Sequence, residues 1–407
     1  MIEQIKEMVQ ITVWHFRQMK ANYYLKRIRQ KKISDGVRKI RVGFLVQMQE
    51  IWDKQAPVYE KLNSDERFVV SLIVVPPRDF GTSAYSFGEY EKLLLFFKTK
   101  YPMADIQKAY DKQWLDLPSK GFDYFFYPTC WDKNLPSEYR PQEVIKYAKT
   151  CYIPYGAGGF RYEKQFYYKR SFFLSLYINF CNAKERVSLF PKSPYKHTLF
   201  LGSPLIDYSI TRQQSIDTNS KRILWTPRWT TEEMYGGTTF FAYKDKILTL
   251  KTKFPNIDLI LRPHPHTFQN ALLLGIMTER DIEEYKKSVE KHGASFDKNE
   301  MVGETFRQTG ILITDYSSII LEFFLSGKPV IYCGKTNICF DEIYEQIVQG
   351  FYIAENWEQL EETVQKLLNG EDNLKTKRMN IIANIKKQHI GATERIVNFL
   401  IKDAYHQ

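Results

Sequence analysis

Polar side chains that suit phosphate binding follow three predicted strands in the second half of the chain. The three segments are Thr226–Trp229 (TPRW), Arg262–His266 (RPHPH) and Ile313–Ser318 (ITDYSS). Arginine and histidine side chains form charge-assisted hydrogen bonds with phosphate oxygens, and the first N–H groups of a helix bind them as well. These residue types therefore predict a phosphate or pyrophosphate site in this half of the chain.

The ITDYSS segment lies between a buried strand and a predicted helix that begins near Ser317. Its polar residues, which are candidate substrate ligands, are Thr314, Asp315, Ser317 and Ser318. Short hydroxyl side chains at a helix start also serve as simple caps, so this segment alone fits a structural role too. Glu322 lies one to two turns further along, where its carboxylate could accept hydrogen bonds from both ribose hydroxyls of a nucleotide.

The RPHPH segment holds His264 between two prolines that keep the backbone extended. We expect His264 to donate to an oxyanion of a pyrophosphate leaving group, and Arg262 to add positive charge. His266 is a weaker candidate, because a lone histidine is more often a packing residue. In the TPRW segment Arg228 is the expected phosphate contact, although an exposed arginine between core aromatics fits the pattern equally well.

Two segments of the first half also carry candidate site residues. Tyr155 and Gly156 open a Gly-rich turn after a predicted strand, and such a turn lets a ligand approach the backbone closely. Glu50 and Asp53 lie in the loop after the first strand, where either carboxylate could act as a general base or simply be solvated. P-loop, dinucleotide-binding and nucleophile-elbow motifs do not occur. We expect no metal and no other cofactor, because a DxD loop and a Cys/His ligand cluster are also missing.

Largely apolar strands alternate with helical segments along both halves of the chain. The expected strands are Ile40–Gln47, Phe68–Pro76, Phe122–Tyr127, Thr150–Pro154, Arg222–Thr226, Ile257–Arg262, Gly310–Thr314 and Pro329–Cys333. This alternation predicts βαβ units and parallel sheets covered on both faces. The expected fold class is α/β and GT-B-like, with two doubly wound Rossmann-type domains facing a cleft. Open α/β sheets bind ligands at the carboxyl ends of their strands, where the polar segments lie.

A chain of 407 residues predicts two domains. The expected parts are a basic amphipathic helical segment at 1–33, an acceptor-side domain at 34–205, a nucleotide-donor domain at 206–385 and a C-terminal helix at 386–407. The five dispersed cysteines fit a reducing compartment. The sequence has no signal-peptide pattern and no apolar stretch of about 18 residues, so we expect no membrane-spanning helix.

Positive charge is concentrated at the N-terminus. The net charge is +11, and residues 1–41 contribute eight of these charges, with 11 Lys and Arg against three acidic residues. The remainder is nearly neutral, so we expect no nucleic-acid partner. Residues 1–32 repeat apolar side chains at helical spacing beside aromatic and basic residues. This pattern fits a helix lying on an anionic membrane surface and equally fits a helix packed on the protein's own core.

The TPRW, RPHP and ITDYSS segments, in this order and spacing, resemble those of the CDP-glycerol glycerophosphotransferase family of teichoic acid and capsule polymer biosynthesis. Gly202–Asp207 (GSPLID) adds to the resemblance, which is strong over about 201–401 and diffuse over 40–200. It implies a GT-B fold and a CDP-glycerol or related CDP-polyol donor, with its pyrophosphate near His264 and the Ser317/Ser318 helix start.

The resemblance also implies a reaction, an acceptor and a location. An acceptor hydroxyl would attack the β-phosphorus of the donor and expel CMP. The acceptor would be a lipid-linked or polysaccharide glycopolymer of the cell wall or capsule. The protein would be cytoplasmic and peripheral on the inner leaflet of the membrane, an anionic surface that residues 1–41 would contact.

One position departs from the family pattern. Well-known wall teichoic acid polymerases and primases carry a His-Gly pair after the strand that matches Thr150–Pro154, and this histidine is thought to be the base. Here the pair reads Tyr155-Gly156, and a phenol with a pKa of about 10 is a poor general base. Glu50 and Asp53 are then the base candidates. A GT-B glycosyltransferase that uses a nucleotide sugar for a surface polysaccharide, or a catalytically degenerate nucleotide-binding subunit, fits the same pattern.

Overall fold

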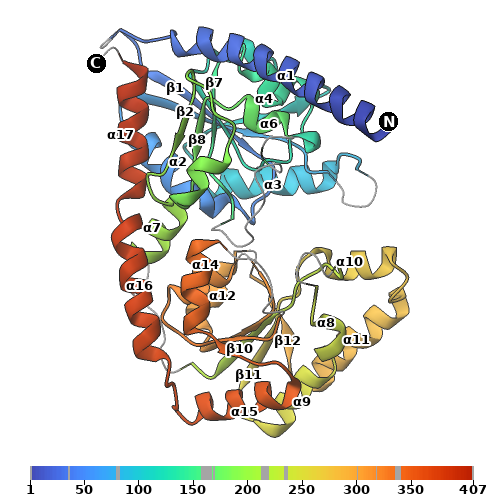
Figure 1. Cartoon of the computed structure of the whole chain (residues 1–407). Coiled ribbons are helices and arrows are strands. Elements are labelled where there is room, and N and C mark those ends of the chain that lie inside the picture. The colour runs from blue at the N-terminus through green and yellow to red at the C-terminus, as the bar shows by residue number, and fades with distance from the viewer. Residues whose placement is uncertain are drawn as a thin grey trace. The chain divides into compact units, whose positions relative to one another are not determined.

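The computed structural model describes residues 2–34, 37–78, 83–156, 167, 170–211, 220–232, 237–299, 301–317, 319–334 and 341–405. The chain divides into two compact units (Figure 1). The first comprises Met1–Tyr155, Tyr162–Asp207 and Gly391–Gln407, and the second comprises Gly156–Arg161 and Tyr208–Ile390. Among the described residues, no helix combines the length and apolar character needed to cross a membrane.

The first unit is built on a seven-stranded sheet in which all neighbouring strands are parallel. In spatial order the strands are β3 (Asp105–Lys108), β2 (Phe68–Val74), β1 (Ile40–Val46), β6 (Tyr124–Tyr127), β7 (Lys149–Tyr152), β8 (Ile178–Phe180) and β9 (His197–Leu199). In β1 the side chains of Val42 and Phe44 pack on one face of the sheet and Leu45 packs on the other, so the central strand is buried on both sides.

Helices cover both faces of this sheet. One face carries α1 (Ile2–Arg29), α2 (Ala56–Asn63), α3 (Phe87–Lys100) and α17 (Ala392–Ala404). The opposite face carries α4 (Pro141–Val144), α6 (Ser171–Leu174) and the hairpin of β4 (Tyr110–Asp111) and β5 (Gln113–Trp114). Helix α17 therefore packs in the same hydrophobic core as α1, although the two are far apart in sequence.

A buried polar cluster fixes α17 to the first unit. The Asp403 carboxylate accepts a hydrogen bond from the Lys149 ammonium at 2.7 Å, and the hydroxyls of Tyr124 and Tyr177 also donate to it at 2.7 Å. Tyr124 lies in β6, Lys149 in β7, and Tyr177 directly before β8. The sequence predicts a helix at 386–407 without saying where it packs, and the structure divides that stretch between α16 (Lys375–His389) and α17.

The second unit has a six-stranded, all-parallel sheet. In spatial order its strands are β12 (Ser295–Phe296), β11 (Asp258–Leu261), β10 (Arg222–Thr226), β13 (Ile311–Thr314), β14 (Val330–Tyr332) and β15 (Tyr352–Ile353). One face is covered by α8 (Phe240–Tyr243), α9 (Lys246–Lys253), α10 (His266–Leu273), α11 (Glu279–Lys291) and α15 (Trp357–Leu368). The other helices described in this unit are α12 (Val302–Gln308), α13 (Ile320–Phe324), α14 (Glu342–Ile347) and α16. The boundary between the two units falls within α7 (Pro204–Thr211), after Asp207.

The predicted fold class, two parallel α/β sheets with helices on both faces, is confirmed. Each predicted strand is present to within about two residues of its expected ends. The prediction missed the strands at or near the sheet edges, which are β3, β8, β9, β12 and β15. All five are only two to four residues long, so they are too short to give a clear apolar pattern.

Candidate functional site

The three polar segments of the second half meet at one edge of the second sheet. TPRW follows β10, RPHPH follows β11 and ITDYSS ends β13, and these three strands are neighbours in the order β11-β10-β13. The backbone N–H of His264 donates to the carbonyl of Pro227 at 3.3 Å, which joins two of the loops directly. The sheet therefore brings together, at its carboxyl edge, segments that are far apart in sequence.

Asp315 lies at the centre of this edge and is fully buried. Its carboxylate accepts hydrogen bonds from the backbone N–H of Arg228 at 2.7 Å and from the backbone N–H and hydroxyl of Thr239 at 2.8 and 2.9 Å. Desolvation raises the pKa of this carboxyl to about 6, although the Thr239 and Arg228 hydrogen bonds oppose the shift. Asp315 thus ties the loop after β10 to the start of α8.

Thr314 is also an internal residue. Its side chain is fully buried, and its hydroxyl lies 2.9 Å from both the carbonyl and the hydroxyl of Thr226 on the neighbouring strand. Thr314 and Asp315 therefore hold the loops in place, and neither side chain is exposed at the edge of the sheet.

The ring of His264 is oriented by its own loop. The backbone N–H of His266 donates to Nδ1 of His264 at 3.2 Å, so the proton of the neutral ring belongs on Nε2. Desolvation, followed by the neighbouring His266 and Arg228, lowers the pKa of His264, and the ring is neutral at neutral pH. The side chain keeps an exposed edge beside the ring of Trp229, so the neutral ring can donate from Nε2 to a bound anion.

The two arginines of the site have different surroundings. The guanidinium of Arg228 lies over the ring of Tyr316, with Cζ 4.5 Å from the ring centroid, and its charge is felt by His264. The guanidinium of Arg262 donates to the Asp297 carboxylate at 2.5 Å and to the Asn299 carbonyl at 2.6 Å, in the loop after β12. Arg228 thus lies with His264, whereas Arg262 anchors the next loop along the sheet.

The helix after ITDYSS begins later than expected. Its first residue is Ile320 and its N-cap residue is Ile319, whereas the sequence predicts a start near Ser317. The Ser317 hydroxyl accepts from the backbone N–H of Ile319 at 3.5 Å, and its carbonyl accepts from the Tyr344 hydroxyl at 3.0 Å. Ser317 and Glu322 are both half-buried. Ser318 lies outside the described residues.

The first-half candidates lie at the carboxyl edge of the first sheet. Glu50 is exposed in the loop after β1, and the Asp53 carboxylate accepts a hydrogen bond from the buried Lys54 ammonium at 2.9 Å. The hydroxyl of Tyr155, which follows β7, accepts from the indole N–H of Trp131 at 3.3 Å. Gly156 comes directly after Tyr155, in a turn whose following residues lie outside the described part of the chain.

Sequence reasoning missed three residues that help to build these edges. Thr239 and Asp297 hold Asp315 and Arg262 respectively, and Asp132 presents a half-buried carboxylate in the loop after β6. Asp297 follows a strand of only two residues, so the pattern did not mark it as a loop residue. Asp132 comes five residues after a predicted strand, which is the one signal that could have identified it.

Two doubly wound parallel sheets, one of them with a polar site at its carboxyl edge, define a GT-B-like protein. Residues 195–402 match the model of the CDP-glycerol:poly(glycerophosphate) glycerophosphotransferase family. Because the match covers more than half of the chain, the protein belongs to this family, a family of CDP-glycerol-type transferases. No curated protein sequence matches the chain closely enough to add to this assignment.

Solved structures with the same fold include a wall teichoic acid polymerase, TagF, soaked with CDPG. It has a TM-score of 0.57 and 14% identity, and 98% of each chain is covered. The UDP-GlcNAc 2-epimerase from Neisseria meningitidis bound to UDP-GlcNAc has a TM-score of 0.56 and 14% identity, covering 89% of this chain and 100% of the epimerase. The S. aureus MnaA-UDP structure has a TM-score of 0.53 and 14% identity, covering 89% of this chain and 96% of MnaA. At this identity the likeness shows the fold alone.

Proposed function

We propose that this protein transfers a glycerol-phosphate or related polyol-phosphate unit from a CDP-activated donor to a hydroxyl of a cell-wall or capsule glycopolymer, releasing CMP. The observation that carries this proposal is the neutral, oriented His264 beside Arg228, within the part of the chain that matches the family. In this role the second unit binds the donor and the first unit binds the acceptor. The protein needs no cofactor.

In the proposed reaction the acceptor oxygen forms a bond to the β-phosphorus while the bond from that phosphorus to the CMP oxygen breaks. The acceptor proton passes to a base, and CMP leaves with the bonding electrons. Nε2–H of His264 donates to the leaving phosphate, and Arg228 balances its developing charge. Ser317 and Ser318 bind the pyrophosphate oxygens, and Glu322 binds the ribose hydroxyls.

Three further residues of the predicted set act through others. Asp315 and Thr314 are positioning residues, because their side chains are buried and hold the loops that carry Arg228 and His264. Arg262 positions the loop after β12 through its ion pair with Asp297.

The acceptor base comes from the carboxyl edge of the first sheet, and Glu50 and Asp53 remain the candidates there. The Lys54 ammonium pairs with the Asp53 carboxylate, which makes Asp53 a weaker candidate for the base. The Asp132 carboxylate, at the same edge, is a third candidate. Tyr155 and Gly156 would contact the acceptor without acting as the base, since a phenol with an ordinary pKa of about 10 is a poor general base.

The degenerate alternative is favoured by one observation, the Tyr155-Gly156 pair in place of the family His-Gly. That alternative predicts nucleotide binding without turnover, and a nucleotide-sugar transferase predicts a different donor preference. A thermal-shift comparison of CDP-glycerol, CDP-ribitol and UDP-GlcNAc, followed by a CMP-release assay, separates all three.

We expect CDP-glycerol or CDP-ribitol at 100 times its Kd to stabilise the protein by about 2.7 kcal/mol, because it binds only the folded state. UDP-GlcNAc at the same concentration should give a smaller shift. CMP release above the rate without protein supports the transferase, and binding without release supports the degenerate subunit. Preferential stabilisation by UDP-GlcNAc would overturn the proposed donor.

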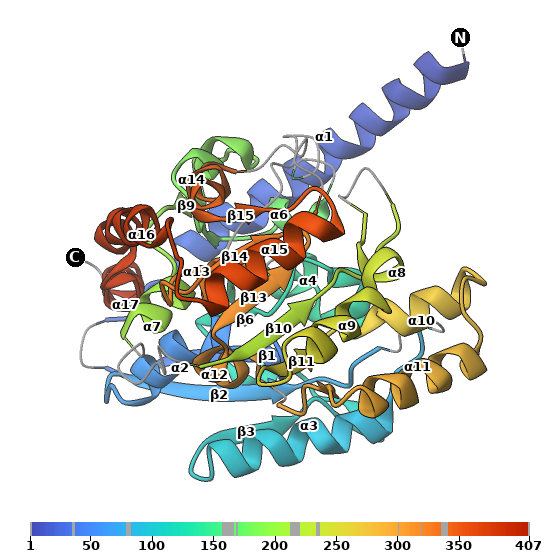
Figure 2. The ribbon, with the colours of Figure 1, turned by 90° about the horizontal axis from the view of Figure 1, so that it is seen from below.

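We also propose that α1 attaches the protein to the cytoplasmic face of an anionic membrane. Helix α1 has apolar side chains on two opposite faces. Trp14, Ala21, Leu25 and Ile28 pack against the core of the first unit. On the other face lie Val9, Val13, Phe16, Met19 and Tyr23, which are exposed and follow one another at steps of three to four residues. Phe16 and Met19 are 64% and 65% exposed. Figure 2 shows the N-terminal half of α1 extending beyond the rest of the first unit. Packing and membrane contact, which the sequence leaves as alternatives, thus use different faces of one helix.

Replacing Phe16 and Met19 together by serine should weaken binding to vesicles that contain phosphatidylglycerol by roughly tenfold or more, because two large apolar side chains lose their lipid contact. The packed face stays intact, whereas deleting residues 1–32 would remove Leu25 and Ile28 from the core. A matched control replaces Leu273 and Leu274, two leucines of the second unit that are also more than half exposed, by serine and should bind vesicles normally. Unchanged sedimentation of the Phe16/Met19 variant with vesicles would contradict the attachment.

A further inference from the structure

The backbone of Arg228 is fixed on both sides of its Cα atom. Its N–H donates to the Asp315 carboxylate at 2.7 Å, and its carbonyl accepts from the Thr238 hydroxyl at 2.5 Å. The carbonyl of the next residue, Trp229, accepts from the Asn270 amide at 3.1 Å. These bonds set the direction in which the side chain leaves the loop. They do not fix the guanidinium, which lies at the end of a long, flexible side chain.

The aromatic ring of Tyr316 lies beneath that guanidinium. Cζ of Arg228 is 4.5 Å from the ring centroid, and an aromatic ring attracts cations within about 6 Å of its centroid. Tyr316 is only 7% exposed, and exclusion of water strengthens such a contact. Because Tyr316 follows Asp315 directly in the ITDYSS segment, two consecutive residues hold the backbone and the head group of the same arginine.

The ring of Tyr316 is itself supported by α14. Tyr344 of this helix is 1% exposed, and its ring centroid lies 6.1 Å from that of Tyr316. The Tyr344 hydroxyl donates to the carbonyl of Ser317 at 3.0 Å, which fixes the backbone directly after Tyr316. The charge of Arg228 contributes to the lowered pKa of His264, so the guanidinium over Tyr316 lies close to that imidazole. The supported ring therefore keeps the guanidinium near the histidine that would donate to the same anion.

We infer that Tyr316 is a positioning residue for Arg228, and that its ring holds the guanidinium where the pyrophosphate of a nucleoside diphosphate binds. The inference rests on the proposed function, in which Arg228 meets the leaving phosphate. An arginine that is ordered before the ligand arrives loses less conformational freedom on binding, so the ring strengthens nucleotide binding without touching the nucleotide. The tyrosine of ITDYSS thus has a role of its own, beside the polar side chains of that segment.

A double-mutant cycle measured with CDP, in the absence of any acceptor, tests this role. Calorimetry gives the Kd of CDP for the wild type, Tyr316→Leu, Arg228→Ala and the double variant. We expect Arg228→Ala to weaken CDP about tenfold or more, and Tyr316→Leu to weaken it about three- to tenfold. In the Arg228→Ala background the leucine change should alter the Kd by less than about twofold, because the ring acts through the arginine. Tyr316→Phe keeps the ring and should bind CDP within about twofold of the wild type.

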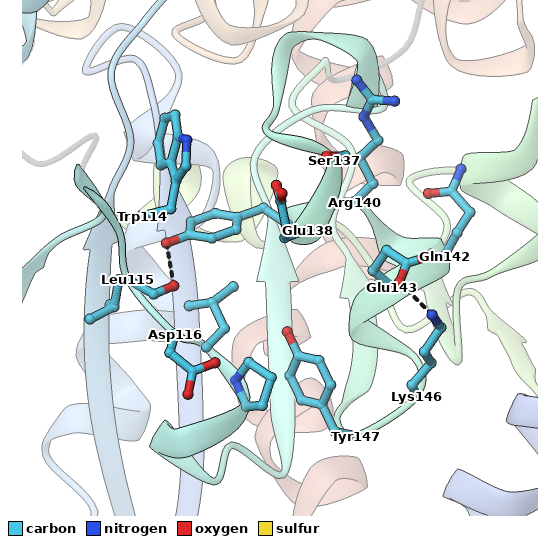
Figure 3. Close-up of a pocket in the computed structure, with 13 residues that line it drawn as sticks. Trp114, Leu115, Asp116, Ser137, Glu138, Arg140, Gln142, Glu143, Lys146 and Tyr147 are labelled. Carbon is cyan, nitrogen blue, oxygen red and sulfur yellow. Dashed lines mark hydrogen bonds and ion pairs between the residues drawn. The ribbon is translucent and has the colours of Figure 1, made fainter. Parts of the chain in front are cut away.

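Two control variants match these changes. Tyr285→Leu removes a tyrosine of the same unit that is similarly buried, at 4% exposed, and whose ring also faces a cation, the Lys244 ammonium at 5.5 Å from the centroid. Arg140→Ala removes an arginine that lines a pocket of about 740 Å³ on the first unit (Figure 3). Both should leave the Kd of CDP unchanged. If Tyr316→Leu does not fold, Tyr316→Met takes its place in the cycle, because the flexible methionine side chain can fill the same space.

An unchanged Kd for Tyr316→Leu, an equal loss with and without Arg228, or an equal loss in Tyr285→Leu would each overturn the inference. The proposed transfer fails in other ways, through absence of CMP release or preferential stabilisation by UDP-GlcNAc. Repeating the cycle with UDP separates the two failures, since a protein that prefers UDP would still show the coupling between Tyr316 and Arg228. A wild type that binds neither CDP nor UDP would overturn both the donor site and the role of Tyr316.

Discussion

His264→Ala should reduce CMP release from CDP-glycerol by about 10²- to 10³-fold in kcat while the protein stays folded. The expected loss is that of one hydrogen-bond donor aimed at charge that develops on the leaving group. His264 suits this role because the N–H of His266 occupies its Nδ1 and its proton lies on Nε2. The rate is measured as CMP formed under saturating donor, and circular dichroism checks the fold.

His264→Gln separates two roles of this ring. A glutamine amide can donate a hydrogen bond but cannot transfer a proton, so a donor role predicts that the glutamine variant keeps well over ten times the activity of the alanine variant. His292→Ala is the control, since His292 is an exposed histidine of the same unit. Normal turnover by His264→Ala would remove the histidine from the mechanism, and equal loss in both variants would assign it proton transfer instead.

Asp315→Ala should lower the free energy of unfolding by about 3 kcal/mol at pH 7, because the donors on Arg228 and Thr239 lose their buried acceptor. Donor binding should weaken with it, since the loop that carries Arg228 loses its anchor. Urea unfolding measures the first effect and the CDP-glycerol thermal shift the second. Asp245→Asn, at an exposed carboxylate of the same unit, should stay within about 0.5 kcal/mol of the wild type.

The same carboxyl predicts a dependence on pH. The pKa of Asp315 in the folded protein, about 6, lies above its ordinary value of 3.8. Protonation of a carboxyl whose pKa rises on folding stabilises the folded state. This stabilisation is complete below the pKa of the carboxyl in the unfolded chain, and it is lost as the pH rises through about 6. The stability of the wild type relative to Asp315→Asn should therefore fall by up to about 3 kcal/mol between pH 4 and pH 6.5. A constant difference between the two proteins over this range would contradict a buried, titrating Asp315.

Long apolar strands made most of the fold predictable. A strand such as Phe68–Val74 is buried along nearly its whole length, so its residues alone identify it. The strand Ser295–Phe296 is half-exposed and two residues long, and it exists only because β11 lies beside it. Edge strands of this kind depend on tertiary pairing, which no local pattern contains.

Residue types predicted where the site lies better than what each residue does there. The carboxyl-edge rule located His264, Arg228 and Asp315 together, because it depends only on strand order. The buried state of Asp315 depends on Thr239, which is 76 residues away in the chain. Likewise, the pairing of Arg262 with Asp297 needs a strand that the sequence does not reveal. Roles set by such long-range partners emerge only from the folded structure.

The position of α17 has a consequence for how the protein is made. Because residues 391–407 complete the first unit, the second unit is in effect an insertion within the first. During synthesis the second unit can fold while the first unit still lacks Ile396, Leu400 and Asp403, which are made after it. A nonsense or frameshift change that removes residues 391–405 would therefore damage the first unit, although the second unit would be complete.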